Sequence, residues 1–121
     1  MIYAFFATGF EETEAIAPID VMRRAGLEAK LVSVTNDLMV TGSHGIAIKT
    51  DELFDNVNFD DAELLFLPGG MPGTKNLDAH AGLCELLQNS AEKDVKLAAI
   101  CAAPMVFCNL GLLNGEKATC Y

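Results

Sequence analysis

The sequence predicts an α/β fold in which helices cover both faces of a doubly wound parallel sheet. Apolar runs of strand length alternate with helical segments along the 121 residues. These runs are apolar at consecutive positions rather than at every second one, which is typical of strands buried on both faces. Because the sequence shows no repeat, low-complexity tract or linker, we expect a single domain over residues 1–121.

The first strand and the first helix are the clearest elements. Ile2–Ala7 is an unbroken apolar run and is predicted as a strand. The helix predicted over residues 11–26 has glutamates in its first turn and Arg23 and Arg24 in its last, which matches the helix dipole. Pro18 falls inside this helix, either within its first turns or at a kink.

The other elements follow from the same patterns. Three further strands are expected at the centre of the sheet, over Lys30–Val34, Leu64–Leu67 and Leu97–Ile100. The remaining expected elements are two short strands around a turn within residues 37–50, helices over residues 79–93 and 103–113, and a strand from Glu116. No helix follows that last strand to cover it, so we expect the domain to be incomplete at its C-terminal end.

Charge and composition exclude several classes of partner. Seventeen acidic residues against eight basic ones give a formal net charge of −9. Such a surface repels phosphate backbones and anionic lipid, so we expect neither nucleic acid nor a membrane as a partner. The uncharged opening run, Met1–Phe10, is shorter than the ~20 apolar residues of a membrane span. It also lacks the basic region of a signal peptide, and we therefore expect a cytoplasmic location.

The cysteines do not predict disulfides or a metal site. Their spacing fits no C-x-x-C pattern, and without an export signal we expect reduced thiols. The two histidines, His44 and His80, fall in separate loops without the spacing of zinc ligands. We expect no metal and no cofactor. The four cysteines are Cys84, Cys101, Cys108 and Cys120.

Cys101 differs from the other cysteines in its position. It lies where a buried strand meets a helix, in "LAAICAAP", whereas the other three are expected to be buried apolar side chains. A strand-to-helix turn is the nucleophile-elbow arrangement, and a helix N-terminus stabilises a thiolate. The backbone N–H of Ala102 would then point at the site as an oxyanion donor.

The start of the first helix supplies a candidate partner for the thiol. Glu11 and Glu12 are predicted to be solvated acids that favour the helix N-terminus. Glu14 lies just before the apolar face, so its side chain either turns toward the strand ends or is a third solvated acid. Beside a thiolate its carboxyl would stay protonated and donate a hydrogen bond to sulfur, because like charges disfavour each other.

A glycine pair, Gly69-Gly70, follows the third buried strand in "LPGGMPG". Such a pair either makes a tight turn or lets backbone approach a substrate closely, with the N–H of Gly70 as a donor. Neither of the common phosphate-binding patterns, G-x-x-x-x-G-K-[ST] and G-x-G-x-x-G, is present. His80 is too far along the chain to be assigned as a base, and His44 is expected to be a solvated loop residue.

Together the stretches "GFEETEAIAPIDVMRRAG", "LPGGMPGTKNL" and "AAICAAP" resemble the ThiJ/PfpI superfamily, in particular its protein-deglycase subgroup, over the whole chain. The resemblance implies a flavodoxin-like fold and a homodimer. It also implies that Cys101 is the elbow cysteine and Glu14 its protonated partner. Gly69, Gly70 and the Ala102 amide match the anion-binding backbone around that thiol.

Two positions depart from the family pattern. The peptidase and glyoxalase branches place a histidine directly after the cysteine or supply one elsewhere, and alanine at position 102 disfavours an intracellular cysteine peptidase. Tyr121 occupies the position where the deglycase subgroup often has a histidine, so a general base is unassigned. On the same resemblance, the helix of Arg23 and Arg24 and the turn Gly42–Gly45 are the expected dimer surface.

Two functions are compatible with this thiol. In the first, Cys101 attacks a small electrophilic carbonyl, such as methylglyoxal or its early adduct on an amine or thiol, as a deglycase or glyoxalase would. In the second, the protein is an oxidative-stress sensor or chaperone in which Cys101 is oxidised to a stabilised sulfinate. The same reactive thiol serves both, so the sequence does not separate them.

Overall fold

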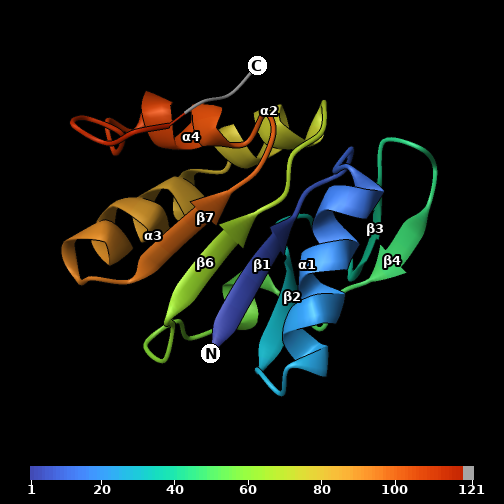
Figure 1. The fold of residues 1–121 in the computed structure, drawn as a ribbon. Helices are drawn as coiled ribbons and strands as arrows, with labels where there is room; N and C mark the ends of the chain where they lie inside the picture. Colours follow the sequence, from blue (N-terminus) through green and yellow to red (C-terminus); the bar gives the residue numbers. More distant parts are fainter. Residues whose placement is uncertain (119–121) are drawn as a thin grey trace.

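A computed structural model of the chain describes residues 1–118, and these form a parallel sheet between two layers of helices (Figure 1). The order of the five strands is β5-β2-β1-β6-β7, all parallel to their neighbours. The strands of this sheet are β1 (Ile2–Phe6), β2 (Ala29–Ser33), β5 (Glu52–Leu53), β6 (Leu64–Leu67) and β7 (Lys96–Ala99). A separate antiparallel hairpin is made by β3 (Met39–Thr41) and β4 (Ala47–Lys49).

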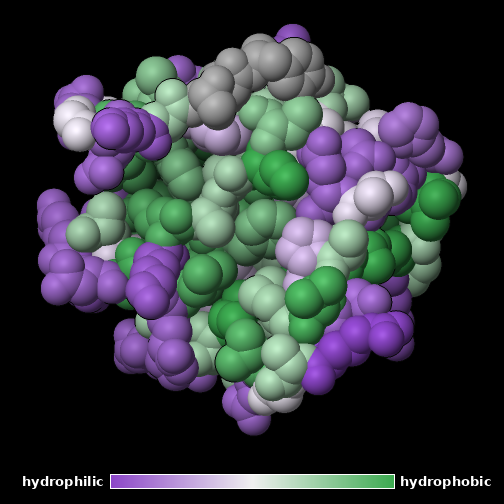
Figure 2. Space-filling model, in the orientation of Figure 1, coloured by the Kyte–Doolittle hydropathy of each residue, from purple (hydrophilic) through white to green (hydrophobic). Residues whose placement is uncertain are grey.

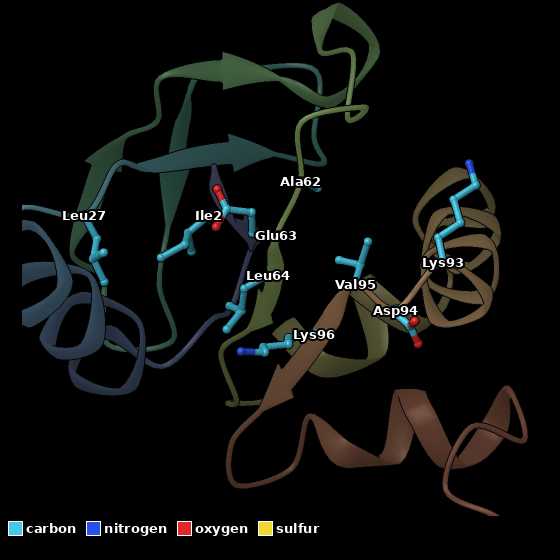
Figure 3. A pocket seen from close by; sticks show the side chains of 9 residues that line it. All are labelled: Ile2, Leu27, Ala62, Glu63, Leu64, Lys93, Asp94, Val95 and Lys96. Carbon is cyan, nitrogen blue, oxygen red and sulfur yellow. The ribbon is translucent and has the colours of Figure 1, made fainter.

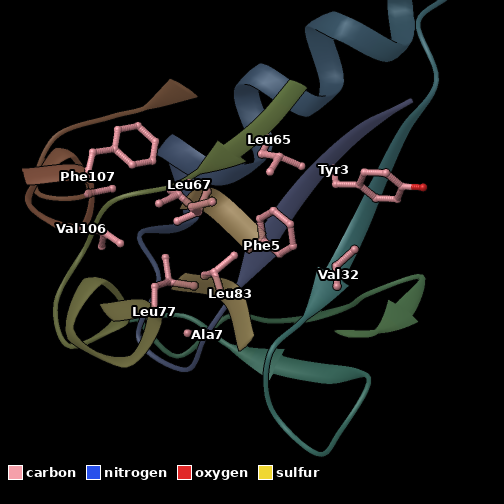
Figure 4. Close-up of a cluster of buried hydrophobic side chains, with 12 residues drawn as sticks. Tyr3, Phe5, Ala7, Val32, Leu65, Leu67, Leu77, Leu83, Val106 and Phe107 are labelled. Atoms are coloured by element: carbon pink, nitrogen blue, oxygen red, sulfur yellow. The ribbon is translucent and has the colours of Figure 1, made fainter. Parts of the chain in front are cut away.

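The helices divide between the two faces of the sheet. Side chains of α1 enter one hydrophobic core, and side chains of α2, α3 and α4 enter the other. Figure 4 shows the second core, in which Phe5, Leu65 and Leu83 lie together. The helices are α1 (Glu12–Arg24), α2 (Gly73–Asp78), α3 (Ala81–Glu92) and α4 (Pro104–Asn109), with a 3-10 turn η1 (Phe54–Asn56).

Strand β1 explains why the apolar runs are continuous. Its successive side chains point to opposite faces, so Phe5 enters the core under α3 while Ala4 and Phe6 enter the core under α1. All three are 0% exposed. A strand buried on both faces needs apolar residues at every position, and the expected doubly wound α/β class is confirmed.

Several predicted elements differ from the observed ones. The helix expected over residues 103–113 ends at Asn109, and α2, β5 and η1 were not predicted. Strand β7 lies at an edge of the described sheet and not at its centre, because it pairs only with β6 there. Residues 116–118 are not a strand, and the remainder of that predicted strand lies outside the described residues.

The two faces of the sheet are covered to different extents. On the α1 side, Ile2, Leu64 and Ala98 are only partly buried against the core. Figure 2 shows hydrophobic atoms gathered on this face, over β6 and β7. Within residues 1–118, no helix has the length and apolar character needed to cross a membrane.

Candidate functional site

The carboxyl ends of β1, β6 and β7 are neighbours in the sheet, and each leads into one of the loops singled out above. Parallel strands bring such loops to one edge, where open α/β sheets bind their ligands. The loops run from Ala7 to Glu11, from Pro68 to Pro72 and from Ile100 to Ala103. In Figure 1 they meet at the upper edge of the sheet.

Cys101 lies in a tight turn between β7 and α4. Its φ is 60°, in the left-handed region that residues other than glycine rarely adopt. The turn is closed by a hydrogen bond from the Ala103 amide to the Ile100 carbonyl at 3.0 Å. A half-buried side chain on a strained strand-to-helix turn has the geometry of a nucleophile elbow.

Glu14 lies in the first turn of α1, and its backbone is fixed by a cap. The Glu14 amide donates to the Glu11 carboxylate at 2.8 Å, which makes Glu11 the N-cap of the helix. The Glu14 side chain is different: its Oε1 is buried and has no hydrogen-bond partner among the described residues. A buried carboxyl oxygen without a hydrogen-bond partner costs free energy, and a functional role is one explanation for such a group in a folded protein.

Gly69 is the point at which Glu14 and Cys101 meet. A Cβ at this position would overlap Glu14 Oε1, and it would lie 2.9 Å from Cys101 Cβ and 2.7 Å from the Ile100 carbonyl oxygen. Both side chains therefore pack on the same spot, and only glycine leaves room for them. No hydrogen bond joins these two described side chains, so donation from Glu14 to sulfur stays a prediction.

The Gly70 and Ala102 amides belong to the residues that directly follow Gly69 and Cys101 in the chain. Gly70 has φ +98° and packs so tightly that a Cβ would lie 2.5 Å from the Glu11 amide nitrogen. Among the described residues, neither the Gly70 nor the Ala102 N–H donates to a protein acceptor. Backbone N–H groups without an acceptor in these loops are candidate donors to a developing oxyanion.

Glu12 is not the solvated acid that the sequence predicted. It is 7% exposed because the tip of the β3–β4 hairpin folds over it. The Glu12 carboxylate accepts from the amides of His44, at 2.8 Å, and Ile46, at 3.2 Å. Burial alone would raise the pKa of Glu12, but hydrogen bonds from the His44 ring and from these amides outweigh it and lower the pKa to about 2.

His44 is exposed as expected, yet it also contacts the first helix. Its Nδ1 lies 3.0 Å from Glu12 Oε1 and 3.9 Å from Glu11 Oε1. The three residues offer ligand atoms within 4.8 Å of one another, an arrangement that can hold a cation. Because Glu12 Oε2 already accepts two backbone hydrogen bonds, we assign the cluster to holding the hairpin.

The remaining histidine and cysteines lie in other surroundings. His80 caps α3 by accepting from the Leu83 amide at 2.9 Å, so its Nδ1 is occupied. Burial, with Asp78 nearby, raises the pKa of Cys84. Cys108 is exposed on α4, which corrects the expectation that it is buried. Cys120 and Tyr121 lie outside the described residues.

A pocket of about 460 Å³ lies at the opposite edge of the sheet (Figure 3). It is formed at the amino ends of β1, β6 and β7, whereas ligands of open α/β sheets bind beyond the carboxyl ends. Its lining mixes apolar side chains with charged ones, and we assign it no role in the candidate site. The lining residues are Ile2, Leu27, Ala62, Glu63, Leu64, Lys93, Asp94, Val95 and Lys96.

The fold and the elbow together define an α/β protein with a cysteine over the carboxyl edge of a parallel sheet. The chain belongs to the DJ-1/PfpI family, whose model matches residues 1–121. Protein DJ-1 homolog B of Arabidopsis thaliana is 41% identical over 120 residues. Deglycase PfpI of Pyrococcus furiosus is 34% identical over 116 residues. The solved structure of oxidized Toxoplasma gondii DJ-1 superimposes with a TM-score of 0.95 at 37% identity.

The chain accounts for only part of each relative's length. The alignments cover 95% of this chain but 26% of the Arabidopsis protein and 68% of the Pyrococcus protein. The Toxoplasma comparison covers 99% of this chain and 66% of that one. Family membership therefore rests on nearly all of the chain, while the activity of the whole protein is a matter for proposal.

Proposed function

We propose that the protein is a cysteine-dependent deglycase or glyoxalase-type enzyme that acts on methylglyoxal or its early adducts. The observation that carries the proposal is the convergence of Glu14 and Cys101 on Gly69. The next residues along the chain, Gly70 and Ala102, have amides without an acceptor among the described residues. Relatives named as deglycases, with 32–34% identity, support the class of reaction. The choice of methylglyoxal follows from the resemblance to the protein-deglycase subgroup, and a nucleophilic thiol suits such a small electrophilic carbonyl.

In this proposal the Cys101 thiolate adds to the aldehyde carbon of methylglyoxal. The C=O bond becomes a C–O⁻ bond, and the amides of Gly70 and Ala102 donate to that oxyanion. Glu14, which is protonated at the outset, first gives its proton to that oxyanion. Its carboxylate then takes the hydrogen of the former aldehyde carbon as a proton and returns it to the adjacent carbon, while the hydroxyl proton passes to the neighbouring oxygen. The resulting thioester of lactate is hydrolysed by water, which regenerates the thiol.

Turnover of methylglyoxal by the wild type and by Cys101→Ser tests this mechanism. We expect the variant to lose at least about a thousandfold in kcat, because an alkoxide is not available at neutral pH where a thiolate is. Cys108→Ser is the matched control, since that thiol is exposed on the adjacent helix and should be dispensable. The chirality of the lactate should be uniform if the proton is returned on one face.

Equal turnover by the wild type and Cys101→Ser would overturn the mechanism. No turnover by either would favour the second candidate, a sensor or chaperone that works through oxidation of Cys101. The oxidized state of the Toxoplasma relative is the observation that favours this alternative. Peptide mass spectrometry after graded peroxide would then show Cys101 modified before Cys84 and Cys108.

We further propose that the protein pairs with a second copy through α1 and the β3–β4 hairpin. Apolar side chains are exposed on these elements: Ile16 is 38% exposed, Met39 49% and Ile46 57%. Flexible methionine suits an adaptable interface. Sedimentation velocity at micromolar concentration should show a dimer, and Ile46→Lys should weaken it. A monomer in the wild type would contradict the proposal.

A further inference from the structure

The tip of the β3–β4 hairpin surrounds the Glu12 carboxylate with polar groups. Both of its oxygens are contacted: Oε2 by the amides of His44 and Ile46, and Oε1 by His44 Nδ1 at 3.0 Å and Ser43 Oγ at 3.5 Å. The hairpin carries glycine where the carboxylate enters, since a Cβ on Gly42 would lie 2.5 Å from Glu12 Oε2. Burying a charge is costly unless hydrogen bonds compensate for it, and these four contacts supply that compensation.

These contacts join the hairpin to the turn between β1 and α1. Two backbone hydrogen bonds reinforce the junction, from the Gly9 amide to the Thr41 carbonyl at 2.9 Å and from the Ser43 amide to the Phe10 carbonyl at 2.8 Å. The first turn of α1 is thus held on one side by the hairpin tip, and Glu12 is the side chain through which it is held.

The loop from Pro68 to Pro72 and the first residue of α2 hold the same turn from the other side. The Glu11 amide donates to the Gly69 carbonyl at 2.9 Å, and the Gly73 amide donates to the Gly9 carbonyl at 3.1 Å. Glu14 lies within this doubly held turn, two residues after Glu12. Because Glu14 Oε1 has no hydrogen bond of its own among the described residues, the backbone of the turn sets where it lies.

We propose that Glu12 is a positioning residue, which clamps the hairpin tip onto the first turn of α1 and thereby holds Glu14 against Cys101. The proposal rests on the function proposed above, in which Glu14 serves the Cys101 thiolate. The charge of Glu12 is part of the clamp. Among the described residues, the titratable groups close to it are His44 on the hairpin and Glu11 on its own turn.

The test measures alkylation of Cys101 by iodoacetamide, followed by peptide mass spectrometry. Glu12→Gln removes the charge of the clamp, and Gly42→Ala displaces the carboxylate from the loop side. Each should displace the pH–rate profile to higher pH and thereby lower the alkylation rate at pH 7, by up to about tenfold for a displacement of about one unit. Thr13→Ala, an exposed neighbour on the same turn, is the control and should leave the profile unchanged.

A double-mutant cycle separates positioning from a merely structural role. Glu14→Leu should lower the rate by itself, and adding Glu12→Gln to it should cause no further loss, because the effect of Glu12 passes through Glu14. A thermal melt of each variant shows how much stability has changed. An undisplaced profile in Glu12→Gln and Gly42→Ala, or an equal further loss in the Glu14→Leu background, would overturn the positioning role.

The failure of this inference is distinguishable from the failure of the proposed function. If Glu14→Leu lowers alkylation but the two clamp variants do not, the role of Glu14 stands and only the clamp is wrong. If Glu14→Leu leaves alkylation of Cys101 unchanged, the proposed role of Glu14 is wrong, and the positioning role of Glu12 is wrong with it.

Discussion

Replacing Gly69 with alanine is expected to lower the Cys101-dependent reaction rate by about a hundredfold, because displacing a catalytic group by about 1 Å costs that much. The added methyl group would overlap Glu14 Oε1 and lie 2.9 Å from Cys101 Cβ. It would also lie 2.7 Å from the Ile100 carbonyl oxygen, which is backbone and cannot turn aside. The Glu14 side chain can move, so we expect it to be the group that is displaced.

The measurement is kcat/KM with methylglyoxal, together with the rate of Cys101 alkylation. Gly26→Ala is the control, because Gly26 has φ +84° but open space where the Cβ would lie. That variant bears backbone strain without a clash, and it should lose some stability and keep its activity. If Gly69→Ala were as active as Gly26→Ala, the meeting of Glu14 and Cys101 at this glycine would have no catalytic meaning.

Phe5→Ala should lower the free energy of unfolding by about 4 kcal/mol, within the range found for deleting a buried aromatic side chain. Phe5 is 0% exposed on the central strand. Its ring lies 5.7 Å from that of Phe59 and 6.1 Å from that of Phe54, centroid to centroid. A loss of this size is a large part of the stability of a typical domain.

Urea titration followed by far-UV circular dichroism measures this change. Val21→Ala is the control, since Val21 is 64% exposed on α1 and should change the unfolding free energy by less than about 0.5 kcal/mol. A loss below about 1 kcal/mol for Phe5→Ala would show that the core relaxes around the missing ring, contrary to the tight packing of β1.

The elements that the sequence predicted well depend on residues that are neighbours in the chain. Continuous apolar runs, the charges at the ends of α1 and the turn between β3 and β4 are all visible within a few residues. The position of Cys101 between a strand and a helix is likewise local, and the structure places it on such a turn with φ 60°. The doubly wound class follows from alternating these local elements.

The candidate site was only partly predictable. The strand ends had to meet at one edge, because the five strands of the described sheet are parallel, and this brings the glycine pair and Cys101 together. Spacing along α1 did not distinguish Glu14 from Glu11 and Glu12. The family resemblance singled out Glu14, and the structure brings its Oε1 to the Gly69 position next to Cys101.

By itself, the sequence determined the alternation of strands and helices and the local setting of Cys101, because periodicity and helix ends are properties of adjacent residues. Only the tertiary structure decided that β7 lies at an edge of the described sheet and that Glu12 is buried. The donors that hold the Glu12 carboxylate lie between Ser43 and Ile46, more than thirty residues further along the chain. No local pattern reports a contact at that separation, since it exists only once α1 and the hairpin have packed.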